Sequence, residues 1–121
     1  MGVFDFEKLD VFTVAVEMVI CVDGLSAALP KGRAYMRDQL RRAANSVALN
    51  IAEGAGEYAS AEKARFYRMA KRSATEAAAQ VTIASCLDLA PGTEVARARQ
   101  LLHRLLSMLV RMAANAEERR H

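Results

Sequence analysis

The sequence of 121 residues predicts an all-α protein, a single domain over residues 1–121 folded as an antiparallel up-down-up-down four-helix bundle. The composition combines 53% hydrophobic residues with only 6% aromatic residues and no Trp, a mixture that favours helix over sheet. Apolar residues also recur at helical spacing in four long segments, and the only prolines, Pro30 and Pro91, lie in the breaks between segments. Four long helices joined by short connections fold most simply as such a bundle.

The first segment, about residues 6–29, carries two apolar stripes at helical spacing. One stripe consists of Val11, Ala15, Met18, Val22, Leu25 and Leu29, and the other of Phe6, Leu9, Phe12, Val16, Val19 and Ile20. The polar sector between them is narrow, so this helix needs cover on both sides. Because a chain this short has few other elements, we expect part of the cover to come from further copies of the chain, which makes the protein a homo-oligomer.

The second segment, about residues 35–53, begins after a break at Pro30 and Gly32. Its apolar face consists of Met36, Leu40, Ala43, Ala44, Val47 and Ile51. The sequence "GAGEYAS" ends the segment. We expect Gly54 to adopt the left-handed conformation just after the helix, Ser60 to cap the next helix, and Glu62 to lie in that helix's first turn.

The third and fourth segments are separated by "APGTE", in which Pro91 and Gly92 break the chain and Thr93 is a candidate N-cap. The third segment, about residues 61–89, has an apolar face of Phe66, Met69, Ala70, Ser73, Ala77, Val81, Ala84 and Leu87. The fourth repeats apolar residues at heptad spacing: Val95, Ala98, Leu102, Leu105, Leu109, Met112 and Ala116. This repeat predicts an inter-helix seam, and its apolar surface adds to what a single bundle must hide.

A polar seam is expected between the second and third helices. If these helices form a hairpin, Glu53 lies opposite Arg65, Arg42 lies opposite Glu76, and Asn50 lies at the margin of the packed face. Partly buried polar groups need partners, so we expect two crossed ion pairs and an amide that fixes the register. The residues of this structural seam are Arg42, Asn50, Glu53, Arg65, Ser73 and Glu76.

Basic residues are concentrated in the middle of the chain, where residues 31–72 contain ten Lys or Arg against four Asp or Glu. Arg65, Arg68 and Arg72 share one face of the third helix, and Arg37 and Arg41 share a face of the second. A solvated helix face is the simple interpretation. The prevalence of Arg favours phosphate recognition, because the guanidinium group binds phosphate with two parallel hydrogen bonds. The candidate nucleic-acid-binding residues are Arg37, Arg41, Arg65, Arg68, Lys71 and Arg72.

No enzymatic chemistry, cofactor or metal is predicted. Cys21 and Cys86 have no metal-binding or redox spacing and are expected to act as reduced core residues. Of the two histidines, His103 is expected on a helix surface, and no His lies where it could serve a serine as base. No apolar stretch is long enough to span a membrane, and the N-terminus is acidic where a signal peptide would be basic, so a cytoplasmic location is expected.

Two stretches of the sequence form a specific combination. They are "LRRAANS" with "NIAEG" at residues 40–46 and 50–54, and "RF" at residues 65–66 leading to Ser73 and Glu76. In this order they resemble the four-helix-bundle family described as 23S ribosomal RNA intervening-sequence (S23-like) proteins. Where the family commonly has Pro before the Asn of its motif, this chain has Leu49, so the second helix should run without a kink. Where the family often has Gly before the motif Ser, this chain has Arg72, which adds bulk and charge beside the seam.

The resemblance implies an up-down bundle that assembles into a homopentamer. It also implies kinship with the accessory protein of diversity-generating retroelements, a basic pentamer that binds nucleic acid and a reverse transcriptase. Two functional interpretations therefore stand: a non-catalytic oligomer that binds RNA or DNA backbone as an accessory or rRNA-insertion-associated protein, and a structural or protein-interaction oligomer with no nucleic-acid role.

Overall fold

The computed structural model describes residues 3–119 and contains four long α-helices, with no strand in that range. They are α1 (Asp10–Ala27), α2 (Ala34–Ala55), α3 (Ser60–Cys86) and α4 (Gly92–Glu118), and two short 3₁₀ helices, η1 (Asp5–Lys8) and η2 (Lys31–Arg33), precede α1 and α2. The all-helical prediction is confirmed, and the predicted segments match these helices to within a few residues. Helix α2 runs without interruption through Leu49, as the absence of proline there predicts.

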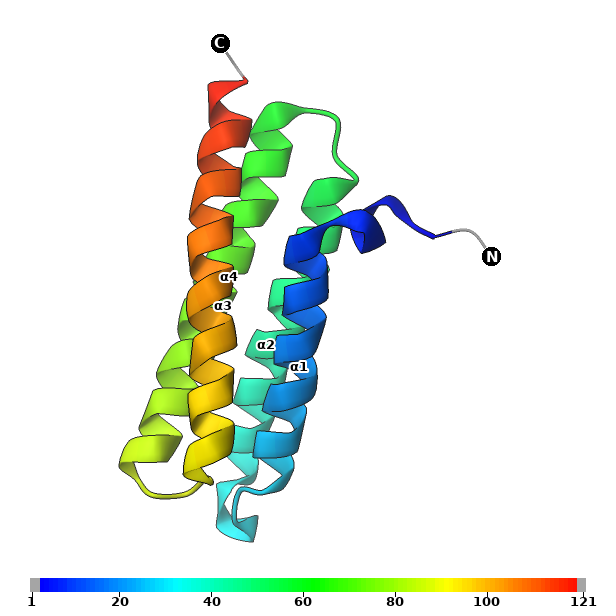
Figure 1. The fold of residues 1–121 in the computed structure, drawn as a ribbon. Helices are drawn as coiled ribbons and strands as arrows, with labels where there is room; N and C mark the ends of the chain where they lie inside the picture. Colours follow the sequence, from blue (N-terminus) through cyan, green and yellow to red (C-terminus); the bar gives the residue numbers. More distant parts are fainter. Residues whose placement is uncertain (1–2, 120–121) are drawn as a thin grey trace.

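The four helices surround one core. Helix α1 packs against α2 and α4, and α3 packs against the same two helices, so α1 and α3 lie at opposite corners. In Figure 1 the chain descends along α1, returns along α2, descends along α3 and returns along α4. Helices α3 and α4 extend beyond the start of α1 at the end of the bundle nearest the C-terminus (Figure 1).

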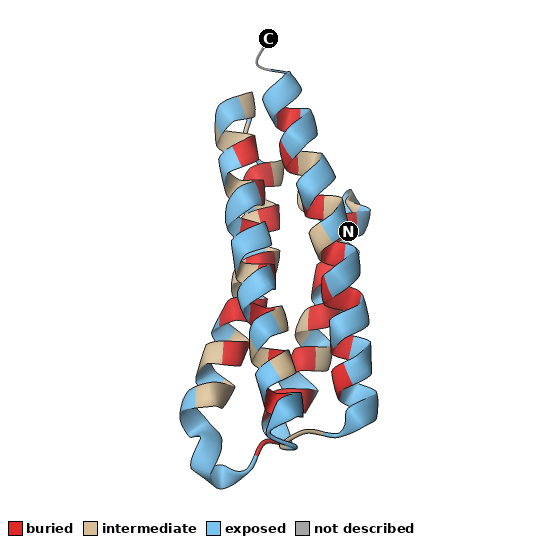
Figure 2. Ribbon diagram, turned by 90° about the vertical axis from the view of Figure 1, so that its left-hand side faces the viewer, coloured by how far each residue is buried: buried red, intermediate tan, exposed pale blue. Residues whose placement is uncertain are grey.

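The core is built from aliphatic residues and many alanines, which form a continuous buried stripe on the inner face of each helix (Figure 2). In α4 every residue of the heptad repeat is buried except Met112, which is half-buried. The heptad seam of α4 therefore packs in the core of the single bundle. The expectation that it adds to the apolar surface that one bundle leaves exposed is wrong.

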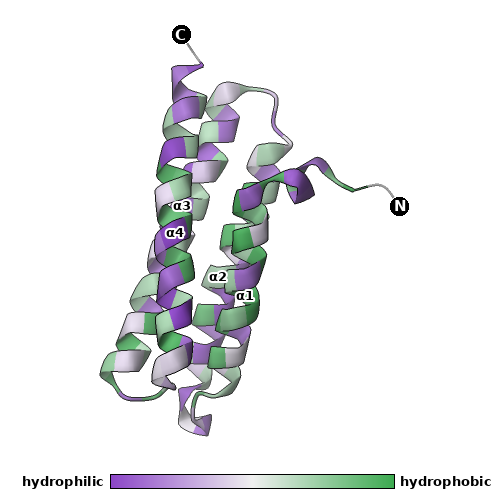
Figure 3. Cartoon of the chain, in the orientation of Figure 1, coloured by the Kyte–Doolittle hydropathy of each residue, from purple (hydrophilic) through white to green (hydrophobic). Residues whose placement is uncertain are grey.

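Helix α1 buries only one of its two apolar stripes. Val11, Met18 and Leu25 are in the core with the rest of their stripe. On the other stripe Val16 and Ile20 are 38% and 68% exposed, and apolar residues lie along the outside of α1 in Figure 3. Phe12 is half-buried against the core, and its ring lies 4.8 Å from that of Phe6, which stacks on Phe4. We name Phe4, Phe6, Phe12, Val16 and Ile20 the α1 ridge.

The buried face of α3 is offset from the predicted one. Phe66 is half-buried and Met69 and Leu87 are exposed, whereas Ala64, Tyr67 and Ala74 are buried. The offset arises because small alanines let α3 approach its neighbours closely, and the larger apolar residues beside them lie at the rim.

Helix ends differ from the sequence predictions. Gly54 lies within α2, and no glycine of the described chain has positive φ, because the helix continues to Ala55 with Gly56 as its C-cap. Ser60 and Thr93 lie inside their helices, whose N-caps are Ala59 and Pro91. Glu62 is in the first turn of α3 as expected.

Gly54 is required by close packing instead of by backbone conformation. A Cβ atom at this position would lie 2.6 Å from Cε1 and 2.9 Å from Cδ1 of Tyr67, and 3.2 Å from Cβ of Phe66. The glycine therefore lets the ring of Tyr67 lie directly against the last turn of α2. Tyr67 is only 5% exposed and belongs to the core.

None of the helices within residues 3–119 is both long and apolar enough to cross a lipid bilayer.

Candidate nucleic-acid interface

The outward surface of α3 carries the most concentrated group of cations. Arg65, Arg68, Lys71 and Arg72 are all exposed on this helix. A shallow open depression on α3 is lined by Arg68, Lys71, Arg72, Thr75, Glu76 and Ala79. Within the described chain neither Lys71 nor Arg72 forms an ion pair, so their charges face solvent.

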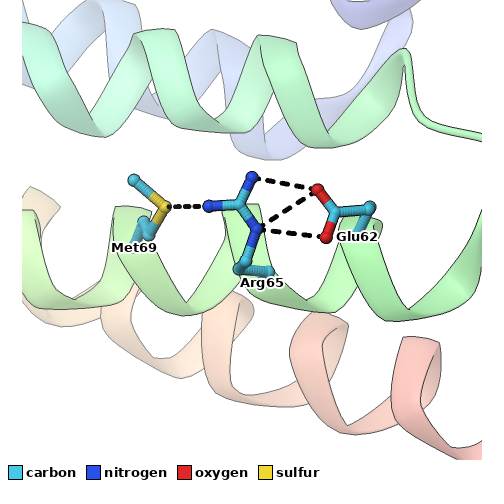
Figure 4. Close-up of polar contacts among 3 residues, drawn as sticks. All are labelled: Glu62, Arg65 and Met69. Atoms are coloured by element: carbon cyan, nitrogen blue, oxygen red, sulfur yellow. Dashed lines mark hydrogen bonds and ion pairs between the residues drawn. The ribbon is translucent and has the colours of Figure 1, made fainter.

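Arg65 is held along its own helix. Its Nε lies 3.2 Å from both carboxylate oxygens of Glu62, and its Nη2 donates to Oε2 of Glu62 at 2.9 Å (Figure 4). The opposite edge of the guanidinium group donates to Sδ of Met69 at 3.4 Å (Figure 4). The Cζ atom of Arg65 lies 4.6 Å from the ring centroid of Phe66. The hydrogen bonds from Arg65 lower the pKa of Glu62, so this carboxylate stays ionised at mildly acidic pH.

Arg68 joins α3 to α4 through an ion pair with Glu117. Both side chains are about half exposed, at 50% and 47%. Ion pairs this accessible stabilise a fold by only about 0–1 kcal/mol. Arg65 and Arg68 therefore remain able to exchange their carboxylate partners for a phosphate.

Arg37 serves a structural purpose at the start of α2. Its Nε donates to the carbonyl of Ser26 at 3.1 Å, and its Nη2 donates to the carbonyls of Leu29 at 2.9 Å and Pro30 at 3.3 Å. These carbonyls lie in the last turn of α1 and just after it, where the helix dipole favours a cation. The half-buried guanidinium group thus closes the α1–α2 connection instead of lying free on the surface.

Arg41 is directed toward α1. Its Nε lies 3.1 Å from Oδ1 of Asp23, although the alignment is too poor for a hydrogen bond, so the contact is mainly electrostatic. The pair lies in a small recess between α1 and α2 that is also lined by Val19, Val22, Ala44 and Asn45. Arg37 and Arg41 therefore have their partners on α1 and in the α1–α2 connection, and they do not belong to the group of cations on α3.

The polar seam between α2 and α3 forms, but with neutral groups. The hydroxyls of Ser46 and Ser73 lie 2.8 Å apart across the two helices. The Asn50 amide donates to the backbone carbonyl and the hydroxyl of Ser46, at 2.9 and 3.0 Å. Farther along, the amide of Gln80 donates to that of Gln39 at 2.9 Å. Both hydrogen bonds of Asn50 stay within α2, and the contact that crosses to α3 is made by Ser46 and Ser73, with Arg72 exposed beside Ser73.

The expected ion pairs of this seam are wrong. Glu53, Arg42 and Glu76 are exposed, and none of them forms an ion pair within residues 3–119, while Arg65 pairs with Glu62 on its own helix. The physical reason is desolvation. Charged groups at the margin of a packed face keep their hydration free energy when they point into water, and they lose much of it when they pair in a narrow seam. The hairpin register was predicted to within one residue, as the Ser46–Ser73 contact shows.

The remaining candidate groups are the histidines, the cysteines and the carboxylates. No three His, Cys, Asp or Glu side chains come together in the described part of the chain in a way that could hold a metal ion. His103 is exposed, as expected. Cys21 is half-buried, and burial raises its pKa. Cys86 is exposed, so its expected place in the core is wrong.

The fold and this surface define a small four-helix protein with a basic helix face and without a recognisable reaction centre among the residues described. The sequence profile of the family described as 23S rRNA-intervening sequence protein matches residues 7–111, and the chain belongs to that family. A search of curated protein sequences gives no significant match. The family assignment is consistent with an rRNA-associated role.

Proposed function

We propose that this chain is the subunit of a non-catalytic homo-oligomer of antiparallel up-down-up-down bundles, located in the cytoplasm, that binds the phosphate backbone of RNA or DNA. The observation that carries the proposal is the face of α3, where Lys71 and Arg72 are exposed, form no ion pair with any residue from 3 to 119, and are flanked by Arg65 and Arg68 in weak, accessible pairs. Phosphate contacts of this kind give affinity with little base specificity. Arg37 and Arg41 support the fold and lie outside this interface.

Filter binding to a structured RNA and to an unrelated duplex across a salt series tests the nucleic-acid interface. If Lys71 and Arg72 each contact one phosphate, the double variant Lys71→Gln/Arg72→Gln lowers the slope of log affinity against log salt by about 2 and weakens both ligands similarly. The matched control is Arg104→Gln/Arg111→Gln, which removes two exposed cations of α4 with the same charge change. Absence of wild-type binding at low salt would remove the nucleic-acid proposal.

The second candidate function, a structural or protein-interaction oligomer, is favoured by the α1 ridge. Ile20 on α1 is 68% exposed, and Leu49 on α2 is 65% exposed. Removing such residues from water contributes about 25 cal/mol per Å², so their burial between copies would stabilise an assembly. The resemblance implies five subunits and suggests a reverse transcriptase as a protein partner.

Light scattering after size-exclusion chromatography tests assembly separately from binding. We expect the wild-type chain to be oligomeric and the Val16→Glu/Ile20→Glu variant to dissociate while keeping its helical circular dichroism. Val110→Glu is the control, because Val110 is an exposed apolar residue of α4 outside the ridge. A folded wild-type monomer at high micromolar concentration would refute the oligomer, and an oligomer without RNA affinity would leave the structural role.

A further inference from the structure

A recess lies at the end of the bundle where α1 starts late. Helix α1 begins at Asp10, whereas α3 and α4 continue past that level, so the last turns of α4 lack an α1 neighbour (Figure 1). The recess has a volume of about 270 Å³, and it is lined by Leu9, Lys63, Tyr67, Met112, Asn115, Ala116 and Arg119. Ligand pockets typically range from about 300 to 1,000 Å³, so this one suits only a small molecule.

The polar part of the lining consists of donors. Lys63 and Arg119 supply two positive charges, Asn115 supplies an amide and Tyr67 a phenol, and none of the lining residues within 3–119 is acidic. The Lys63 ammonium is fixed in place, because it donates to the carbonyls of Gly54 at 2.8 Å and Ala55 at 3.4 Å. An ammonium has three donors, so one remains for a ligand.

Tyr67 adds a second observation that points to a ligand. Its side chain is 5% exposed and lines the recess. Its hydroxyl has no hydrogen-bond partner within residues 3–119 and is not sealed from solvent, so a ligand oxygen in the open space of the recess can accept its hydrogen bond. Burial raises the pKa of Tyr67, and the positive charge of Arg119 opposes that rise.

The other part of the lining is apolar and consists of Leu9, Met112 and Ala116. We infer that the recess binds a small organic carboxylate, with the carboxylate group held by Lys63, Arg119, Asn115 and the Tyr67 hydroxyl, and a short hydrocarbon body against the apolar wall. Bare phosphate is disfavoured because it would leave that wall without a contact. This site is independent of the proposed interface on α3, since none of its lining residues belongs to that interface.

Binding is measured by ¹H–¹⁵N correlation spectra of the full chain titrated with butyrate, inorganic phosphate and the neutral analogue butanol. We expect saturable shifts with butyrate at the backbone amides of Lys63, Tyr67 and Asn115. Phosphate and butanol should bind about tenfold or more weakly, since each lacks one of the two kinds of contact. No saturable shift with butyrate, or phosphate binding as tightly as butyrate, would overturn the inference.

The decisive variant is Asn115→Asp, which keeps the size of an exposed side chain and places a negative charge among the donors. We expect it to weaken butyrate binding about tenfold. Asn45→Asp on α2 is the matched control and should bind as the wild type does. Arg119→Gln, at the exposed end of α4, provides a second variant that does not depend on the folding of the first. Unchanged affinity in both recess variants would refute the site.

The phenol of Tyr67 gives a direct readout. In a Tyr35→Phe/Tyr58→Phe background Tyr67 is the one tyrosine left, so the rise in absorbance near 295 nm with pH reports the ionisation of Tyr67 alone. Both replaced residues are exposed. A bound carboxylate disfavours the phenolate, so saturating butyrate should raise the Tyr67 pKa, and an unchanged pKa would contradict contact with the hydroxyl. Butyrate should bind equally well to Lys71→Gln/Arg72→Gln, so failure of the nucleic-acid proposal would not affect this result.

Discussion

Replacing Gly54 with Ala tests how the α2–α3 hairpin is packed. Alanine is favoured over glycine inside a helix by about 1 kcal/mol, so at an open helical position this change stabilises a protein. At position 54 the new Cβ would lie 2.6 Å from a ring carbon of Tyr67 and 3.2 Å from Cβ of Phe66. The clash therefore opposes the helix propensity.

The size of the effect follows from which atoms can move. The Phe66 Cβ is tied to the α3 backbone, and the Tyr67 ring is packed in the core, so neither can yield without cost. Overpacking of this kind costs about 1–3 kcal/mol. After subtracting the propensity gain, we expect Gly54→Ala to lower the free energy of unfolding by up to about 2 kcal/mol.

Urea unfolding followed by circular dichroism at one protein concentration measures this difference, because assembly makes stability concentration-dependent. Gly24→Ala in α1 is the matched control, since nothing lies within 4 Å of its Cβ, and it should stabilise the chain. In a Tyr67→Ala background the sign should reverse, and Gly54→Ala should then stabilise by up to about 1 kcal/mol. Stabilisation by Gly54→Ala in the wild-type background would refute the packing argument.

Three further changes test individual polar groups. Ser26→Ala should raise the free energy of unfolding by about 1 kcal/mol in urea titrations, because the hydroxyl of Ser26 is fully buried without a hydrogen bond; a loss of stability would contradict this. Arg37→Gln should lower the free energy of unfolding by about 1.5–3 kcal/mol by removing a charged donor from the end of α1, whereas Arg33→Gln should be neutral; equal effects would contradict the role of Arg37 in closing the α1–α2 connection. Glu62→Gln should strengthen RNA binding in filter assays about two- to fivefold by releasing Arg65, and Asp38→Asn, with the same charge change, should have less effect; equal gains would indicate only net charge.

The sequence predicts the helices well because their apolar periodicity is strong. All residues of the buried α1 stripe and nearly all of the α4 heptad repeat are in the core. The second stripe of α1 was predicted to need a partner, and the single chain leaves Val16 and Ile20 exposed. Periodicity reports how much apolar surface a helix carries, and the structure shows how much of it one bundle covers.

The features that the sequence did not predict depend on the close approach of two helices and on which of several acceptors an arginine binds. Tyr67 was missed because its burial depends on the absence of a side chain at Gly54, a pairing that no periodicity reveals. The ion pair of Arg65 was misassigned because Glu62, one turn earlier on the same helix, reaches the guanidinium group with less loss of hydration than Glu53. The role of Arg37 was missed because its acceptors are backbone carbonyls, which carry no signal in the sequence.

The pairing of arginines on α3 also determines how the proposed interface should respond to its surroundings. A phosphate at Lys71 or Arg72 displaces only water and counterions, whereas a phosphate at Arg65 must displace the carboxylate of Glu62. A phosphate contact at Lys71 or Arg72 therefore contributes fully to the salt dependence of the affinity. A phosphate contact at Arg65 contributes less, because salt weakens both the phosphate contact and the competing ion pair with Glu62. Since Arg65 lowers the pKa of Glu62, acidification releases Arg65 only below the usual titration range of a glutamate, so affinity at neutral pH should depend mainly on Lys71 and Arg72.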